Sequence, residues 1–388
     1  MKVIHFVQDF SLLSQTFVYD LIKALDDESG MENEVITYRR HLAQERPYHG
    51  VRVIPQLSFP SKLVYRLLKV LGQRKILGSR VRRLRGETHG LRQYDLIHAH
   101  FGRAGYDLLK AAPKDSDLAK KMIVSLHGTD TTYSMHADHE YRDTLIAAAG
   151  KGCTFVANSF YLMEKALEAG LPPSRLRIVP NSCNDAFRLA GRSLPYTGGT
   201  LRIATVGRLV SWKGQEYLIR ALPEIIASIG AVELVVIGEG SERGRLEELA
   251  AELGVGPDVR FAGGVPHAGI PGILASCHIY VQPSVRDETT GQEESSGVAI
   301  LEALAVGLPV VVSDSGGMGE TIGYASSAVA RLVRQRESED IAVAVIRTAK
   351  DAASFNPDDR TRVSILEKYS KRKQIDALTV LYREQGSK

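Results

Sequence analysis

Short apolar runs separated by helix-length amphipathic stretches are the strongest constraint on the fold of this chain. In the first half the runs are KVIHFV (2–7), NEVITY (33–38), VRVIP (51–55), DLIHAH (95–100), MIVSLH (122–127), TFVANS (154–159) and LRIVPN (176–181). In the second half they are LRIATVG (201–207), VELVVIG (232–238), DVRFAG (258–263), HIYVQPS (278–284) and PVVVSD (309–314). Strands that alternate with helices in this way predict an α/β fold of parallel sheets covered by helices.

The two series are separated by SLPYTGGT (193–200), where Pro, Gly and Ser interrupt the pattern and predict a linker. A chain of 388 residues is long enough for two domains. We therefore expect one α/β domain over residues 1–192 and a second over residues 201–365. In open sheets of this kind, ligands bind beyond the carboxyl ends of the strands, so the loops after the strands are the places to look for function.

Other features of the sequence limit the class of protein. No run of about 18 uncharged apolar residues occurs, so we expect no transmembrane helix. The start MKVIHFVQDF predicts a buried strand rather than a signal peptide. The three cysteines, Cys153, Cys183 and Cys277, are widely spaced and lack the spacing of metal ligands. We expect them to be free thiols in a reducing cytosol.

Positive charge is concentrated in one segment, residues 61–92. It holds ten Lys or Arg residues against one acid, Glu87, whereas the whole chain has a net charge of +4. Leucines and valines interleaved on a helical repeat predict an amphipathic helix on an anionic membrane surface. The alternative is a solvated basic helix beside the core. Nucleic acid is disfavoured, because the segment carries a single aromatic, Tyr65, and no recognised binding module.

Two cations follow the first strand of the second half. In TVGRLVSWKGQEYLIRAL, Arg208 and Lys213 lie in the turn between that strand and a helix that we expect to begin near Gly214. An arginine fork and a compact ammonium suit a diphosphate, although solvated loop charges are the usual alternative. Glycine turns follow the next two strands, at Gly238 and Gly263, but the dinucleotide fingerprint is not met.

The stretch EESSGVAILEALAVGLPVVVSDSGG (293–317) places acids on both sides of an expected helix start. The helix is predicted to begin near Val298 and to end at Gly307. Free amides at its start form an anion site, with Glu294 just before it and Glu302 about two turns on. Eight residues at helical rise span roughly 12 Å. Phosphate between two acids that accept from vicinal hydroxyls fits a nucleotide sugar, whereas either acid alone could be a cap or a surface residue.

With these motifs together, the sequence resembles the retaining glycosyltransferases of the GT-B type, which have two Rossmann-like domains. It is similar to the large group with a glutamate–seven residues–glutamate signature. Within that group it most resembles the exopolysaccharide glycosyltransferases. GRLVSWKG, VIGEGSER, FAGGVP, the pair Glu294 and Glu302, and GLPVVVSDSGGMGE follow in the family's order. The resemblance implies that residues 1–192 bind the acceptor and residues 201–365 the nucleotide sugar. The tail, 366–388, resembles a closing helix that crosses back to the first domain.

The resemblance assigns donor-site roles to residues of the second half. Arg208 and Lys213 should neutralise the diphosphate, together with the backbone of Gly297 and Val298 at the helix start. Because these groups stabilise the leaving diphosphate, neither a metal nor another cofactor is implied.

Recognition of the nucleoside and the sugar is assigned in the same way. Glu302 should bind the ribose, and the backbone at Val265 and Gly238 should lie near the nucleoside. Glu294 and His127 should hold the sugar beside the reacting carbon. Whether Glu294 acts as nucleophile or as electrostatic support is left open. A packed core histidine is the alternative for His127.

The acceptor side departs from the commonest family pattern. Ser14 and Thr16 lie in a Ser-Gln-Thr-Phe loop that resembles the Ser-Glu-Thr-Phe loop of exopolysaccharide enzymes, and they could instead cap the first helix. His98 and His100 share one face of a strand. A metal there would need a third ligand, so a packed or hydrogen-bonded pair is favoured, with His100 a candidate on the acceptor side. We also expect Asp130 to orient the loop around His127.

We therefore expect a cytosolic enzyme that moves a sugar from a nucleoside diphosphate to a glycan or lipid-linked acceptor, with segment 61–92 resting on the inner face of the membrane. The nearest alternative is a nucleotide-sugar epimerase of the same fold. An NAD-dependent dehydrogenase is less favoured, because the dinucleotide fingerprint is incomplete. A catalytically inactive binding protein is a further alternative.

Overall fold

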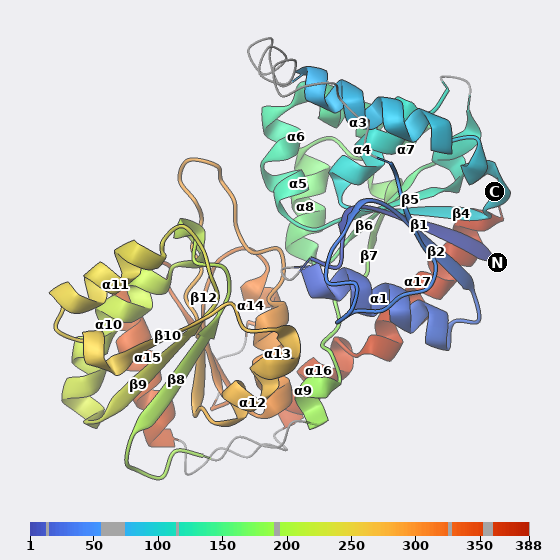
Figure 1. The fold of residues 1–388 in the computed structure, drawn as a ribbon. Coiled ribbons are helices and arrows are strands. Elements are labelled where there is room, and N and C mark those ends of the chain that lie inside the picture. Colours follow the sequence, from blue (N-terminus) through green and yellow to red (C-terminus); the bar gives the residue numbers. More distant parts are fainter. Residues whose placement is uncertain are drawn as a thin grey trace. The chain divides into compact units, whose positions relative to one another are not determined.

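The computed structural model describes residues 1–12, 15–55, 74–113, 116–189, 195–324, 328–351 and 360–387. The chain divides into two compact units, each treated separately below (Figure 1). Unit 1 comprises 1–158, 162–179 and 375–388, and unit 2 comprises 159–161 and 180–374. Both termini therefore belong to unit 1, where a side chain added at Gly386 would touch Met1.

Unit 1 is built on one sheet of seven parallel strands. They are β1 (Lys2–Phe10), β2 (Glu32–Arg40), β3 (Val51–Val53), β4 (Leu96–His100), β5 (Met122–Leu126), β6 (Thr154–Ala157) and β7 (Leu176–Ile178). Their order in the sheet is β3-β2-β1-β4-β5-β6-β7. The chain first builds outward from β1 and then returns to add β4 on the other side, so the order reverses between β1 and β4. Loops after these two strands flank the switch point where such sheets bind ligands.

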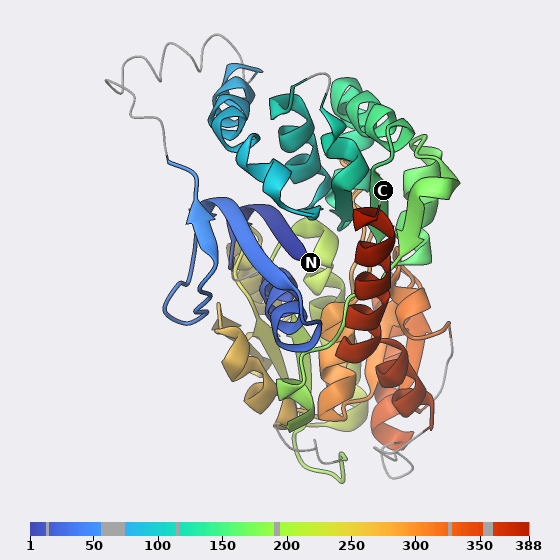
Figure 2. The ribbon, with the colours of Figure 1, turned by 90° about the vertical axis from the view of Figure 1, so that its right-hand side faces the viewer.

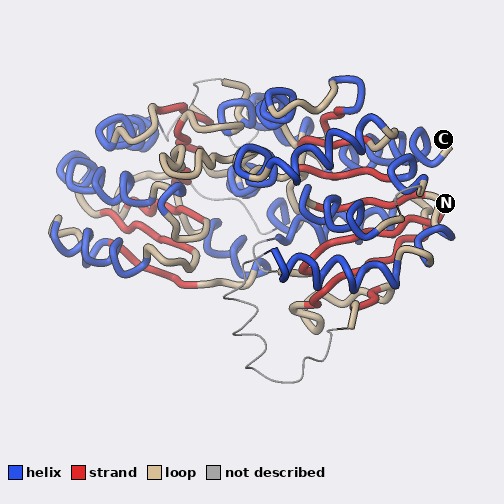
Figure 3. Tube along the Cα trace, turned by 90° about the horizontal axis from the view of Figure 1, so that it is seen from above, coloured by secondary structure: helices blue, strands red, loops and turns tan. Residues whose placement is uncertain are grey.

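Helices cover both faces of this sheet, as the tube in Figure 3 shows. They are α1 (Thr16–Glu28), α3 (Arg74–Glu87), α4 (Gly102–Ala111), α5 (Thr129–Thr132), α6 (Ser134–Ala137), α7 (His139–Gly150), α8 (Phe160–Glu168) and α17 (Lys371–Gly386). Helix α17, red in Figure 2, packs through Ile375, Leu378 and Tyr382 on apolar side chains of the strands. Gln385 anchors its end, because the Gln385 amide donates to the carbonyls of Lys120, Met122 and Gly152.

Unit 2 repeats the plan with six parallel strands. They are β8 (Leu201–Val206), β9 (Val232–Ile237), β10 (Val259–Gly263), β11 (Ile279–Gln282), β12 (Val310–Ser313) and β13 (Ala330–Val333), in the order β10-β9-β8-β11-β12-β13. Its helices are α9 (Ala186–Leu189), α10 (Gln215–Ile229), α11 (Arg243–Glu252), α12 (Ile270–Ala275), α13 (Val298–Val306), α14 (Met318–Thr321), α15 (Ser338–Lys350) and α16 (Arg360–Lys368). Here the order reverses between β8 and β11. The two sheets confirm the expected α/β class with two Rossmann-like domains.

The boundary between the units lies at residues 179 and 180, earlier than the linker that we placed at 193–200. Helix α9 belongs to unit 2 because Phe187, fully buried, packs in the same apolar cluster as α13. Residues 190–194 lie outside the described part. At the other end, α16 stays with unit 2, where Arg362 donates to the carbonyl of Ala305 at 2.9 Å.

Glycines end or begin the helices of unit 2 where the sequence predicted. Gly214, with φ +66°, is the N-cap of α10, and a Cβ there would lie 2.0 Å from the carbonyl oxygen of Pro283. Gly307, with φ +97°, ends α13. Both positions need the left-handed backbone that glycine adopts at little cost.

The basic segment is described only in part. Residues 61–73 lie outside the described residues, and α3 accounts for most of the remainder. Arg83 of α3 donates to the carbonyls of Ile54 and Pro55, which ties the helix to the loop after β3. Within the described part of the chain, no helix is both long enough and apolar enough to cross a bilayer.

Candidate functional site

Lys213 and Glu294 meet at the switch point of unit 2. Lys213 ends a 3₁₀ turn (η5, Ser211–Lys213) after β8, and Glu294 lies in the loop after the neighbouring strand β11. The Lys213 ammonium donates to Glu294 Oε1. Gln282 and Ser284 also donate to this oxygen, at 3.1 and 3.2 Å. The two charged side chains are only 15% and 11% exposed, so they form a nearly buried ion pair.

A tryptophan lies beside both predicted cations. The Lys213 Nζ lies 4.5 Å from the centre of the Trp212 ring, and the Arg208 guanidinium lies 5.6 Å from it. Cations at these distances are attracted to the face of the indole. Arg208 is exposed and forms no ion pair with any residue that the structure describes. Trp212, the only tryptophan of the chain, was not singled out from the sequence.

Helix α13 begins at Val298, as predicted, with Gly297 as its N-cap. The Gly297 N–H donates to the hydroxyl of Thr321 at 3.4 Å. The N–H groups of Val298 and Ala299 have no partner among the described residues, so they are the open donors of the helix start. Glu302 lies four residues after Val298, about one turn or roughly 6 Å along the axis, rather than the two turns expected. Glu294 lies in a loop, so the 12 Å helical estimate does not apply.

The glycine turn SDSGG holds the loop of Glu294 in place. Gly317 N–H donates to the Glu294 carbonyl at 2.8 Å. A Cβ added at Gly316 would lie 2.0 Å from that same carbonyl oxygen, and one at Gly317 would lie 2.1 Å from the carbonyl oxygen of Ser295. The backbone of this turn can therefore lie against the backbone of Glu294 and Ser295 only because Gly316 and Gly317 lack side chains.

Glu302 has a histidine partner that sequence reasoning missed. His267, in the 3₁₀ turn after β10 (η7, His267–Gly269), lies 2.8 Å from Glu302 Oε1 through Nε2. The ring of the fully buried Phe187 lies 5.1 Å from the imidazole. Val265, two residues before His267, is half-buried. No local signal marks His267, because its contact with α13 depends on how η7 and α13 pack.

Gly238 has a structural reason to be glycine. Its φ is +143°, and a Cβ there would lie 1.9 Å from the carbonyl oxygen of Gly207, at the end of β8. The loops after β8 and β9 thus approach backbone to backbone. A nucleoside role for Gly238 remains a prediction.

In unit 1, His127 lies in an aromatic pocket after β5. Its ring centre lies 4.9 Å from that of Phe17 and 4.6 Å from that of Phe101. His127 is partly buried, and its desolvation lowers its pKa to about 3, so the imidazole is neutral at pH 7. Asp130 accepts from the His127 N–H at 3.0 Å and from the Gly102 N–H at 2.8 Å, and so orients this loop as expected.

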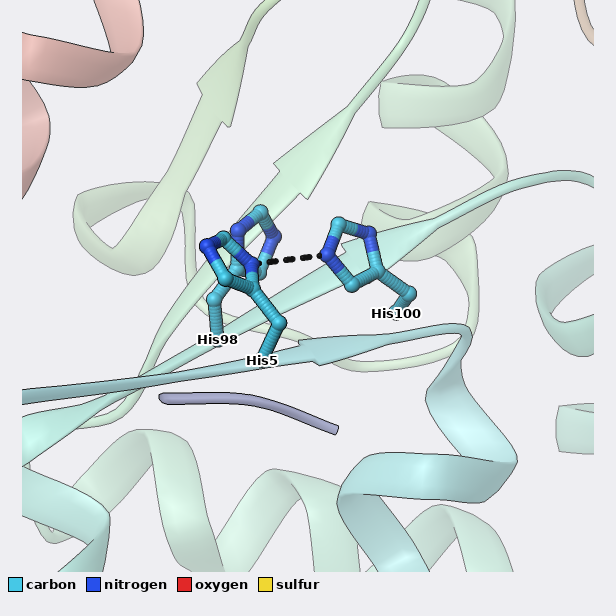
Figure 4. Close-up of side chains that lie close together, drawn as sticks. All are labelled: His5, His98 and His100. Carbon is cyan, nitrogen blue, oxygen red and sulfur yellow. Dashed lines mark hydrogen bonds between the residues drawn. The ribbon is translucent and has the colours of Figure 1, made fainter. Parts of the chain in front are cut away.

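A third histidine joins the pair on β4 (Figure 4). Parallel pairing of β1 with β4 places His5 beside His98, and His100 follows two residues on. His5 Nδ1 lies 3.0 Å from His100 Nε2, and His5 Nε2 lies 3.0 Å from the Asn33 side-chain oxygen. Because that oxygen only accepts, His5 donates from Nε2 and its Nδ1 accepts from His100.

The remaining contacts of this cluster also lie within unit 1. His98 bonds to the Tyr382 hydroxyl at 2.5 Å and to the Ser125 hydroxyl at 2.7 Å. The three rings could offer nitrogens within 4.8 Å of one another to a metal ion. Five of their six ring nitrogens are already hydrogen-bonded, however, and only His100 Nδ1 has no partner. This favours the hydrogen-bonded packing that we expected.

The acceptor-side residues are placed only in part. Thr16 is the first residue of α1, and Gln15 is its N-cap without a side-chain capping bond, so Thr16 does not cap this helix. Ser14 lies outside the described residues. His100 is fully buried within the histidine cluster.

Comparisons with known proteins match both halves of the chain. Residues 193–364 match the family model described as "Glycosyl transferases group 1", and residues 14–187 match the one described as "Glycosyltransferase Family 4". The chain is 29% identical over 346 residues to an uncharacterized glycosyltransferase of Methanocaldococcus jannaschii, covering 83% of this chain and 82% of that protein.

Two further similarities concern named proteins. The chain is 30% identical over 254 residues to the GDP-mannose-dependent alpha-(1-6)-phosphatidylinositol monomannoside mannosyltransferase of Mycolicibacterium smegmatis, covering 63% of this chain and 64% of that enzyme. The structure of Anabaena HepE in complex with UDP and glucose superposes with a TM-score of 0.73 at 19% identity, over 98% of this chain and 99% of that one. With a glycosyltransferase family model on each half, the group 1 model on residues 193–364 and the family 4 model on residues 14–187, and this fold throughout, the chain belongs to the glycosyltransferases with the GT-B fold.

Proposed function

We propose that this protein is a retaining glycosyltransferase that moves a sugar from a nucleoside diphosphate, UDP or GDP, to a hydroxyl of a lipid-linked or other cell-surface glycan intermediate. The observation that carries the proposal is the meeting of Lys213 and Glu294 at the switch point of unit 2, next to the start of α13. A GDP-mannose-dependent relative and a structural neighbour that binds UDP support a nucleoside diphosphate as the carrier.

The diphosphate is the leaving group in this reaction. The bond between the sugar's anomeric carbon and the β-phosphate oxygen breaks, and a bond from that carbon to the acceptor oxygen forms. The acceptor's proton leaves with the diphosphate or to solvent. Negative charge grows on the β-phosphate, where Lys213, Arg208 and the open N–H groups of Val298 and Ala299 stabilise it. The fixed cations and the helix start supply the positive charge that offsets it, so we propose that no metal ion is needed.

Glu294 changes partners when the donor binds. Without a donor, Lys213 neutralises Glu294. A bound diphosphate competes for the same ammonium, and Glu294 then accepts hydrogen bonds from sugar hydroxyls beside the reacting carbon. Gln282 and Ser284 continue to hold the carboxylate in place during this exchange. The ion pair is therefore a resting arrangement of two groups that each serve the donor.

The nucleoside binds further along the same helix. Glu302 accepts from the ribose hydroxyls, and the backbone near Val265 and Gly238 meets the base. In unit 1, the neutral His127 imidazole contacts the sugar, and the loop containing Ser14 and Thr16 meets the acceptor. His100 is buried in the histidine cluster and holds the core beneath the acceptor side in place. Segment 61–92 rests on the anionic inner face of a membrane, which places the enzyme in the cytoplasm beside a lipid-linked acceptor.

Intrinsic fluorescence tests the proposal directly, because Trp212 is the only tryptophan and both cations lie against it. Titration with UDP-, GDP-, ADP- and TDP-sugars should change the emission of Trp212 for one base preferentially. Release of nucleoside diphosphate is then measured with the best binder. Lys213→Met and Glu294→Gln should each lower turnover by about 10²–10³-fold, whereas Arg334→Met, at an exposed ion pair, should not.

Product analysis completes this test. The configuration at the anomeric carbon of the product, measured by NMR coupling, should match that of the donor. Turnover at the wild-type rate in both site variants would refute the proposal. An altered sugar formed from donor alone would show epimerisation instead.

A further inference from the structure

Glu302 and His267 form a contact that the proposed function leaves unexplained. The two residues are 35 positions apart and come from different elements, η7 and α13. The His267 side chain is 16% exposed and the Glu302 side chain 8%, so the contact lies largely out of water. A charge-assisted hydrogen bond in such surroundings is stronger and more directional than one on the surface.

When Glu302 is ionised its carboxylate only accepts hydrogen bonds, and His267 Nε2 then donates across the 2.8 Å contact. Burial of a carboxylate is costly without such a donor. His267 thus satisfies one of the roughly four lone-pair sites of the carboxylate in the resting protein.

The imidazole is held rigidly on its other side. Phe187 of α9 is fully buried and its ring lies 5.1 Å from that of His267, at 55°. Phe187 also packs in the apolar cluster that contains Leu301 and Leu304, which flank Glu302 on α13. One packed unit therefore fixes both the donor and the helix that carries the acceptor.

We infer that His267 is a positioning residue for the nucleoside: it fixes the Glu302 carboxylate in the orientation that accepts hydrogen bonds from the vicinal ribose hydroxyls. This inference rests on the proposed ribose role of Glu302. Both oxygens of a carboxylate must face a diol to accept from its two hydroxyls. A carboxylate that can rotate loses that pairing, so the loss of His267 weakens ribose recognition although His267 does not contact the ribose in this account.

The experiment compares nucleotides with and without ribose hydroxyls. UDP, GDP and their 2′,3′-dideoxy analogues are titrated against wild type, His267→Phe and His267→Gln, with Trp212 emission as the readout. Phenylalanine keeps a ring against Phe187 but removes the donor, and glutamine retains an N–H donor. The matched control is His278→Gln, because His278 precedes β11 at the amino end of the strand, away from the loops of the site.

We expect wild type to bind the ribonucleotide at least 10-fold more tightly than its dideoxy analogue. His267→Phe should reduce that ratio to about 2-fold or less, mainly by weakening ribonucleotide binding. His267→Gln should recover part of it, and His278→Gln should keep the wild-type ratio. In turnover assays, His267→Phe should raise KM for the nucleotide sugar while kcat changes less than about 2-fold. Each ratio compares two ligands on one sample, so it does not depend on the fraction of folded protein.

The outcomes separate this inference from the proposal on which it rests. If wild type discriminates and His267→Phe discriminates equally well, the inference is overturned and the proposed function stands. If wild type binds both nucleotides equally, Glu302 does not read the ribose, and both the inference and that role fail. If wild type binds none of the nucleotides, the proposed function itself fails.

Discussion

Lys213→Met separates the structural and catalytic roles of the buried ion pair. The substitution keeps the length of the side chain and removes its charge. Glu294, which is only 9% exposed, is then left with an uncompensated charge. Breaking a buried pair on one side costs about 3–5 kcal/mol. We expect the lower end, about 3 kcal/mol, because Gln282 and Ser284 still donate to the carboxylate. For a unit of this size that corresponds to a fall in Tm of about 6–12 °C.

The double variant Lys213→Met/Glu294→Gln gives the opposite result for stability. It removes both charges, and the new amide can accept from Gln282 and Ser284, so most of the lost stability should return. Activity should not return, because the diphosphate has lost a cation and the sugar has lost its acid.

Thermal unfolding followed at Trp212, together with release of nucleoside diphosphate, measures both quantities. Arg334→Met is the control, because Arg334 forms an exposed ion pair with Asp340 that is worth roughly 0–1 kcal/mol. An unchanged Tm in Lys213→Met would refute the buried pair, and an active double variant would refute its role in the reaction.

Three further predictions concern other parts of the chain. Burial lowers the pKa of His5 to about 4, and those of His98 and His100 well below their usual value, so these histidines contribute stability above pH 6.5 that is lost as the pH falls toward 4. His5 alone should account for about 2 kcal/mol between pH 6.5 and 5, measured by urea unfolding, and His5→Gln should flatten the curve; an unchanged pH profile would contradict this. Gly238→Ala should destabilise unit 2 by about 2 kcal/mol or more, because the new Cβ meets a backbone carbonyl and the left-handed φ is strained; a Tm equal to wild type would show that the two loops can separate. The protein should sediment with anionic vesicles and not with neutral ones at low salt through segment 61–92, and equal recovery on both would contradict the membrane prediction.

Much of the fold could be predicted from the sequence because its signals are local. Short apolar runs located strands β1 to β12, and Gly214 and Gly307 located the ends of two helices. Strand β13 was missed, because Arg331 interrupts its short apolar pattern. That arginine is buried and bonds to Thr348 and Asp351, and a sequence does not reveal such partners.

The candidate site was predicted residue by residue, but not its contacts. Lys213 and Glu294 were each singled out, whereas their pairing depends on β8 and β11 being neighbours, a property of sheet order. The third imidazole, His5, follows in the same way from the pairing of β1 with β4. His267 was missed because its contact with Glu302 arises from the packing of two distant segments. Local patterns thus name candidates, and topology decides which of them meet.

A crystal structure with the nucleoside diphosphate that binds most tightly would test the central claim most directly. We predict that the diphosphate lies against Lys213, Arg208 and the N–H groups of Val298 and Ala299, and that Glu302 accepts from both ribose hydroxyls. A nucleotide bound elsewhere, or one bound here with the Lys213–Glu294 pair intact and Glu302 turned away from the ribose, would contradict it.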